Sequence, residues 1–182
     1  HYLMDLPRYS FGVRQALKLK YDAAQQQRDR VFMGDTVEFD NFVLKKNVTF
    51  CACLPGWAKW TPRPVLGVLA NCIPVVLEDG NSLPFAASLQ WDKFSIRLTE
   101  QDAANLTEIL AAVSEEQIKA YQREMLKVAP LFVWNADYSH APGQVGDALL
   151  AELAQLPYVS GLRASALPGG APEALNLPKG AY

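Results

Sequence analysis

The chain has 182 residues, about half of them apolar, and a formal net charge of −2. This length suits one ordinary hydrophobic core with a short appendage. The charge balance, without a block of Lys and Arg, argues against a nucleic-acid-binding face, and the longest apolar runs are too short to span a bilayer.

The N-terminal part contains one clear helical signal. Because the chain begins with His1 rather than Met, we interpret it as a fragment or a processed product, whose missing targeting segments say nothing about location. Ser10 is a candidate N-cap, and apolar residues follow at helical spacing, which predicts a helix over 10–27. A second helix or an irregular segment is expected over 37–44.

Three predicted strands follow, separated by amphipathic helices. A β-branched and aromatic run at 48–53 and an apolar run at 73–77 predict buried strands, and alternation predicts a third strand over 94–98. This order indicates an α/β fold with a mostly parallel sheet covered by helices on both faces.

The helices between and after these strands have recognisable starts. Thr61-Pro62 is a candidate helix start, and Thr99 with Asp102, like Ser114 with Gln117, matches a capping box. The predicted helices span 61–70, 99–113, 114–128 and 144–156. The stretch 160–182 is rich in Ala, Gly and Pro and is expected to lack packed structure of its own.

Three cysteines lie on or beside the first two predicted strands: Cys51, Cys53 and Cys72. They are too few for a disulfide scaffold and lack zinc-site spacing, and the first two point to the same face of their strand. Either all three are small buried apolar side chains, or one disulfide forms, for which we expect Cys51 and Cys72. Two triplets, Asn47-Val48-Thr49 and Asn105-Leu106-Thr107, match the glycosylation sequon and fit a lumenal protein.

The segment between the first strand and the next helix carries the strongest chemical signal. The strand ends at Pro55-Gly56, and the helix begins with the hydroxyl of Thr61 and the guanidinium of Arg63. Ligands of open α/β sheets bind at the carboxyl ends of the strands, and exposed N–H groups at a helix start favour anions such as a diphosphate. The residues therefore predict an anion site around Gly56, Thr61 and Arg63. The other interpretation is a surface arginine beside an ordinary strand–helix turn.

The same segment resembles a known family. The run FCACLPGWAKWTPR, followed by NCIPVVLEDGNSLPF and LQWDKFSI, closely resembles the core signature of exostosin-like glycosyltransferases, and the upstream YSFGVRQAL resembles the Gly-x-Arg element of that family. The resemblance covers about Tyr9 to Trp134. It implies one Rossmann-like lobe of a two-lobed, GT-B-type enzyme that transfers a sugar from a UDP-sugar, with inversion, to a polysaccharide or a glycoprotein glycan. We accordingly expect a donor-binding lobe over 1–135 and a C-terminal helix with a tail over 136–182.

The resemblance also implies roles for single residues. Arg14 and Arg63 match arginines expected to bind the diphosphate and offset charge on the departing UDP, and Thr61 matches a hydroxyl residue beside it. Independently of the resemblance, Gly56 forms the turn. Trp57 and Trp60 are candidates to flank the ligand, with Trp57 shielding the base. Asp79 follows the second strand at the same sheet edge and is a candidate contact to the donor sugar, although turn formation explains it equally well.

Packing is the preferred interpretation of Trp60 and of Trp91, and His140 is interpreted as a solvated loop residue. No nucleophile, metal or tightly bound cofactor is expected in this lobe. The resemblance implies a general base in an absent N-terminal lobe, a UDP-sugar and a glycan acceptor as partners, and the lumenal side of the Golgi membrane as the location, through an absent anchor.

The sequence departs from the family pattern at several positions, including Leu54 and Pro55, which replace the usual Pro and following polar residue in the turn. Leu66 stands where the family has an acidic residue suited to hydrogen-bonding the nucleotide ribose, and Asn71 stands where Gly is common. The substitution by leucine motivates a first alternative, a non-catalytic nucleotide-sugar-binding or scaffolding paralogue. A second alternative is an unrelated Rossmann-like enzyme.

Overall fold

The computed structural model describes residues 9–21, 31, 48–77, 80, 83–133 and 144–155. The chain divides into two compact units, which we call the sheet unit (His1–Pro84 and Gln90–Ala129) and the C-terminal unit (Phe85–Leu89 and Pro130–Tyr182). The described elements, in chain order, are η2 (Tyr9–Gly12), α1 (Val13–Lys20), β1 (Phe50–Cys53), α4 (Arg63–Leu69), β2 (Ile73–Leu77), η3 (Trp91–Lys93), β3 (Ile96–Leu98), η4 (Glu100–Asn105), α5 (Leu106–Ala111), α6 (Glu115–Val128), η5 (Ala129–Phe132) and α7 (Gln144–Gln155).

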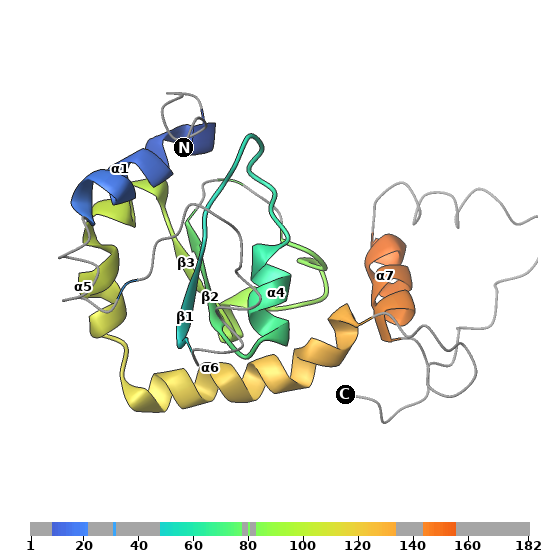
Figure 1. The fold of residues 1–182 in the computed structure, drawn as a ribbon. Coiled ribbons are helices and arrows are strands. Elements are labelled where there is room, and N and C mark those ends of the chain that lie inside the picture. Colours follow the sequence, from blue (N-terminus) through green and yellow to red (C-terminus); the bar gives the residue numbers. More distant parts are fainter. Residues whose placement is uncertain are drawn as a thin grey trace, which may run out of the picture. The chain divides into compact units, whose positions relative to one another are not determined.

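The sheet unit is built on three parallel strands in the order β1-β2-β3 (Figure 1). Cys51 of β1 pairs with Pro74 of β2, and Val75 of β2 pairs with Ile96 of β3. All five residues of the central strand β2 are buried, as the unbroken apolar run predicts. The predicted α/β fold with a parallel sheet is therefore confirmed.

Helices cover both faces of this sheet (Figure 1). On one face, Val75 and Leu77 of β2 form a buried cluster with residues of α1 and with Ala103 and Leu106 from η4 and α5. On the other face, α4 and α6 pack against β2. A Cβ atom at Gly67 of α4 would lie 2.9 Å from the carbonyl oxygen of Cys72, so only glycine lets α4 approach the sheet this closely.

The first helix starts later than the sequence predicts. Ser10 is not its N-cap, because Ser10 and Phe11 have left-handed backbone angles (φ 57° and 51°) and Gly12, with φ 84°, takes the cap position. The physical reason is a long-range contact: Ser10 is buried, and its N–H donates to the carbonyl of Gly56 at 3.0 Å. The helix also ends at Lys20 rather than at residue 27.

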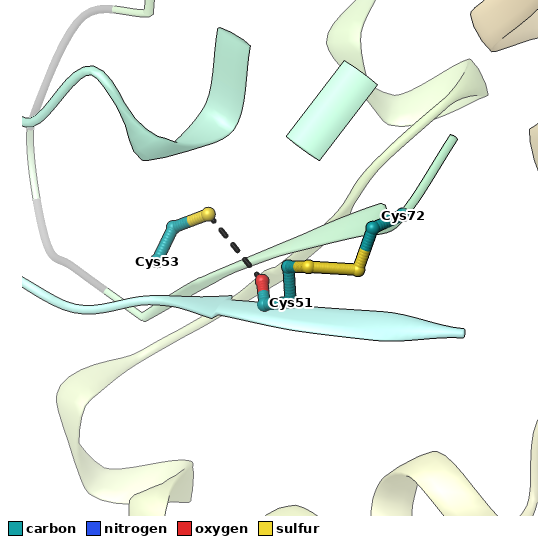
Figure 2. The surroundings of a disulfide bond; sticks show 3 residues. All are labelled: Cys51, Cys53 and Cys72. Carbon is teal, nitrogen blue, oxygen red and sulfur yellow. Dashed lines mark hydrogen bonds between the residues drawn. A yellow bond between two sulfur atoms is a disulfide. The ribbon is translucent and has the colours of Figure 1, made fainter. Parts of the chain in front are cut away.

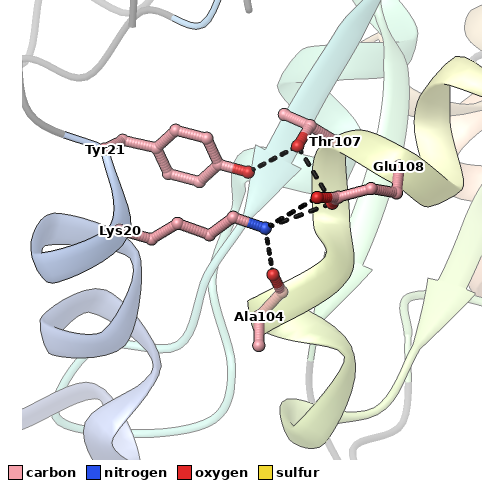
Figure 3. Close-up of polar contacts among 5 residues, drawn as sticks. All are labelled: Lys20, Tyr21, Ala104, Thr107 and Glu108. Carbon is pink, nitrogen blue, oxygen red and sulfur yellow. Dashed lines mark hydrogen bonds and ion pairs between the residues drawn. The ribbon is translucent and has the colours of Figure 1, made fainter. Parts of the chain in front are cut away.

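Polar contacts at the end of α1 fasten it to α5 (Figure 3). The ammonium of Lys20 donates to both carboxylate oxygens of Glu108, at 3.2 and 3.1 Å, and to the carbonyl of Ala104. The hydroxyl of Tyr21, whose ring is buried, lies 2.8 Å from the hydroxyl of Thr107. Tyr21 thus leaves the helix and enters the core, which explains why α1 stops there.

The helix α4 begins at Arg63, with Pro62 in the cap position predicted for Thr61. The hydroxyl of Thr61 still accepts the N–H of Arg63 at 3.5 Å, so the start has moved by the one residue that assignments at helix ends commonly allow. Just after the helix, Asn71 has φ 55°, a left-handed conformation that glycine adopts at lower cost. This conformation explains why glycine suits the position.

Both predicted capping boxes are confirmed, at Thr99 with Asp102 and at Ser114 with Gln117. The helix predicted over 99–113 is instead divided into η4 and α5, because Asn105 leaves the helical region between them (φ −114°, ψ 20°). The third strand, β3, is also shorter than predicted. Phe94 and Ser95 precede it as buried residues, and the Ser95 hydroxyl donates to the carbonyl of Trp91.

A disulfide joins Cys51 of β1 to Cys72, the residue before β2, with their Cα atoms 5.8 Å apart (Figure 2). Cys51 and Cys53 lie on the same buried side of β1, as their spacing predicts, while Ala52 between them is exposed. Cys53 is a buried thiol whose Sγ contacts the carbonyl oxygen of Cys51 at 3.4 Å. The disulfide therefore fixes the beginning of β2 against β1. The strand β1 is also the one that leads into the predicted anion site.

The C-terminal unit gathers Phe85–Leu89 with the last part of the chain. The ring of Phe85 stacks on that of Phe132 at 5.8 Å, and the backbone N–H of Ala87 and the hydroxyl of Ser88 donate to the carboxylate of Glu152 on α7. The sequence did not indicate this grouping, because it joins segments far apart in the chain. The predicted boundary at 135 lies outside the described residues.

Four other predictions also fall outside the described residues: the segment 37–44, the sequon at Asn47, His140 and the tail over 160–182. Among the described helices, none has the length and apolar character needed to cross a membrane.

Candidate functional site

A cavity of about 320 Å³ lies where β1 leads into α4, within the sheet unit. This volume is at the lower end of the range of small-molecule sites. The lining comes from three segments that the fold brings together: the residues around the start of α1, the turn after β1, and the first turn of α4. The lining residues are Tyr9, Arg14, Leu54, Gly56, Trp57, Ala58, Trp60, Thr61, Pro62, Arg63 and Leu66.

Arg14 is the residue of α1 that lines this cavity. Its Nε donates to the carbonyl of Pro55 at 3.0 Å and one terminal nitrogen donates to the carbonyl of Leu54 at 3.4 Å. The guanidinium also lies 5.6 Å from the centre of the Tyr9 ring, within the range of a cation–π contact. Arg14 therefore ties α1 to the turn after β1 and lines the cavity at that turn.

The two arginines of the cavity repel each other. Burial, followed by the positive charge of Arg63, lowers the pKa of Arg14. Arg63 is also the first residue of α4, where the helix dipole disfavours a cation. Among the described residues that line the cavity, none carries a carboxylate to balance these charges. An anion bound between the guanidinium groups would remove this unfavourable electrostatic energy.

The two tryptophans of the cavity are largely exposed. Trp57 and Trp60 retain 61% and 59% of their accessible surface, although both line the cavity. Trp57 meets the ring of Tyr9 edge-on at 5.4 Å. The preferred interpretation of Trp60 as a packing residue was wrong, because more than half of its surface is exposed. The same interpretation of Trp91 is confirmed, since Trp91 is buried.

The structure brings five of the six predicted donor-site residues to this one cavity: Arg14, Gly56, Trp57, Thr61 and Arg63. The sixth, Asp79, lies outside the described residues. Leu66 also faces the cavity, so the departure noted in the sequence falls on the site itself. The functions of these residues stay predictions.

Sequence reasoning missed Tyr9 as a member of the site. Its ring is placed by Arg14 and Trp57, and the backbone beside it is held by the bond from Ser10 to Gly56. The available signal was an aromatic residue close to an arginine that the family resemblance already singled out. Aromatic rings and guanidinium groups commonly stack in this way.

A family model described as the exostosin GT47 domain matches residues 13–113. A probable glucuronoxylan glucuronosyltransferase of Arabidopsis thaliana is 36% identical over 143 residues, which cover 77% of this chain and 28% of that protein. The probable glucuronosyltransferase 47 A of Physcomitrium patens is 36% identical over 114 residues, covering 60% and 25% of the two chains. A probable beta-1,4-xylosyltransferase of Arabidopsis thaliana is 38% identical over 103 residues, covering 54% and 23%. The chain thus spans about a quarter of the length of these relatives.

Proposed function

Because this chain belongs to the exostosin GT47 family of glycosyltransferases, we propose that it is the lobe that binds the UDP-sugar donor in an enzyme extending or decorating a plant-type polysaccharide. The observation that carries the donor role is the pair of guanidinium groups, Arg14 and Arg63, at one cavity whose described lining has no carboxylate. A diphosphate supplies the negative charge that such a cavity lacks.

The names of the relatives support the choice of acceptor. They include a glucuronoxylan glucuronosyltransferase and a β-1,4-xylosyltransferase, so we propose a xylan-type chain as the glycan that receives the sugar. A chain of this kind is built of β-1,4-linked pyranose rings.

In the proposed reaction, an acceptor hydroxyl attacks the anomeric carbon of the sugar. The new C–O bond forms as the bond to the diphosphate breaks, with inversion at that carbon, and UDP departs with the electron pair. The two arginines stabilise the charge that develops on the leaving diphosphate. The proton of the acceptor hydroxyl passes to a general base, which we propose lies in a part of the protein outside this chain.

The disulfide supports a lumenal location. Disulfides persist in oxidising compartments and are rare in the cytosol, and Cys51 is joined to Cys72. The exposed Asn105 of the second sequon is compatible with the same compartment. We therefore propose the lumenal side of the Golgi membrane as the site of action.

Calorimetric titration of the chain with UDP tests the donor role. We expect saturable binding of UDP and much weaker binding of uridine, because the nucleoside lacks the diphosphate that the arginines attract. Pyrophosphate separates the contribution of the diphosphate from that of the uridine. It should compete with UDP if Arg14 and Arg63 provide most of the affinity. A folded sample that binds neither UDP nor pyrophosphate would rule out the donor role.

A second candidate function follows from Leu66. Its side chain lines the cavity and accepts no hydrogen bond, so the ribose hydroxyls lose a partner that a carboxylate would provide. This position favours a non-catalytic nucleotide-sugar-binding paralogue, in which the donor is held with reduced selectivity for its ribose.

Replacing Leu66 by glutamate tests the argument about the ribose. We expect Leu66→Glu to tighten UDP binding by about fivefold, since a charge-assisted hydrogen bond outweighs the lost freedom of the new side chain by about 1 kcal/mol. The matched ligand is 2′,3′-dideoxy-UDP, which has no ribose hydroxyl to donate. If the gain appears equally with both ligands, or with neither, the ribose argument is wrong.

A further inference from the structure

Trp60 is the feature of the cavity that the diphosphate does not explain. Trp60 belongs to the lining and yet keeps 59% of its surface exposed. Tryptophan is enriched among the residues that contribute most to binding energy. Trp57 differs, because its ring is already placed against Tyr9.

The chemistry of transfer places a second ligand beside the donor. When a sugar is transferred, the acceptor hydroxyl must come within about 3–3.5 Å of the anomeric carbon. The end of the acceptor glycan therefore lies next to the sugar attached to the diphosphate. A long glycan must then continue from the cavity past its rim. Trp60 both lines the cavity and is exposed, so its ring is accessible to such a glycan.

The indole ring matches a pyranose ring in shape and polarity. The axial C–H groups of a β-linked pyranose form an apolar face, which packs on the flat, electron-rich face of an aromatic ring. Tryptophan provides this contact at a low cost in conformational entropy because its side chain has two rotatable bonds. The nearby cation, Lys59, pairs with Glu100 at 3.5 Å and lies 5.3 Å from the centre of the Phe11 ring, so its ammonium is directed to these neighbours.

Resting on the proposed function, we propose that Trp60 is a stacking platform for the acceptor glycan, and that it holds a β-1,4-linked pyranose chain at the rim of the donor cavity. The role is one of positioning and specificity. Trp60 would select glycans that present a regular apolar face, and the arginines would hold the donor independently of the acceptor.

The test is calorimetric titration of the chain, saturated with UDP, with xylohexaose and with cellohexaose. We expect Trp60→Ala to weaken oligosaccharide binding roughly tenfold, as loss of a well-placed aromatic contact does. Trp60→Phe should retain most of the affinity because it keeps a flat ring. Leu19→Ala is the control, since Leu19 is 87% exposed on α1 and is not part of the cavity lining. It should leave oligosaccharide binding unchanged.

A second readout separates stacking from a structural effect. The indole N–H resonance of Trp60, assigned by its absence in Trp60→Phe, should shift on addition of xylohexaose, and circular dichroism should show all variants folded. Equal affinities for Trp60→Ala and the unmodified chain overturn the proposal. Binding of UDP without binding of either oligosaccharide also overturns it and leaves the donor role intact. Failure to bind UDP as well would instead reject the proposed function.

Discussion

Replacing Arg63 by alanine should weaken UDP binding by roughly 10- to 150-fold, which corresponds to the loss of a hydrogen bond between charged groups worth about 1.5–3 kcal/mol. Arg63 lies at the cavity, at the start of α4, and the charge of Arg14 is close enough to be felt there. Its position is electrostatically unfavourable in the absence of an anion, so the residue contributes to binding at the expense of stability. Calorimetric titration measures the affinity, and thermal unfolding without ligand measures the stability.

Thermal unfolding distinguishes a role of Arg63 in ligand binding from a role in stabilising the fold. Because Arg63→Ala removes a repulsion, the unfolding temperature of the ligand-free variant should be no lower than that of the unmodified chain. Arg97→Ala provides the matched control, since Arg97 is exposed on β3 of the same unit and is absent from the cavity lining. It should leave UDP binding almost unchanged. An unaltered dissociation constant for Arg63→Ala in a folded sample would exclude Arg63 from the site.

Removing the disulfide should lower the free energy of unfolding of the sheet unit by about 3 kcal/mol, the loop-closure value for cysteines 21 residues apart. The bond between Cys51 and Cys72 closes a loop that contains the turn after β1 and all of α4. A reduced chain gains conformational freedom mainly in the unfolded state. Urea unfolding, followed by tryptophan fluorescence with and without dithiothreitol, measures the difference.

Two variants control for side effects of the reductant. The double variant Cys51→Ala with Cys72→Ala should unfold at a low urea concentration that dithiothreitol no longer changes. Cys53→Ala keeps the disulfide, so its unfolding should still respond to dithiothreitol, although loss of the buried sulfur lowers its baseline stability. If the unmodified chain unfolds at the same urea concentration in both conditions, the disulfide does not stabilise the fold.

Local signals in the sequence predicted most of the sheet unit. The unbroken apolar run of β2 identified a central buried strand, and two capping boxes located the starts of η4 and α6. These features depend on residues within a few positions of one another. The spacing of Cys51 and Cys53 correctly placed both on one face for the same reason.

Predictions failed where distant residues decide the local structure. Ser10 is a residue type typical of an N-cap, but its backbone N–H donates to the carbonyl of Gly56. The left-handed turn before α1 therefore depends on a contact that no local pattern encodes. Trp60 is largely exposed, which its residue type and its neighbours in sequence do not indicate. Likewise, Tyr9 joins the site because the adjacent Ser10 is hydrogen-bonded to Gly56, which is distant in sequence.

The candidate site was largely predictable, but not from physical patterns alone. The strand end, the turn and the helix start indicated an anion site at Gly56, Thr61 and Arg63, whereas Arg14 entered through the family resemblance. No physical pattern indicated Arg14 because it lies far from β1 in the sequence. Its hydrogen bond to Pro55 spans 41 positions. Asp79 lies outside the described residues, so its predicted role stays a prediction.

If the proposed diphosphate binds, the hydrogen bonds from Arg14 to the carbonyls of Leu54 and Pro55 make its binding and the docking of α1 thermodynamically linked. Arg14 reaches the cavity only while α1 is packed against the sheet, so a diphosphate held by both arginines binds the docked state alone. By mass action, the free energy of that selective binding adds to the free energy that keeps α1 in place. The donor substrate would therefore complete the folding of its own site, and the N-terminal helix would be the part of the lobe whose opening responds most to donor concentration.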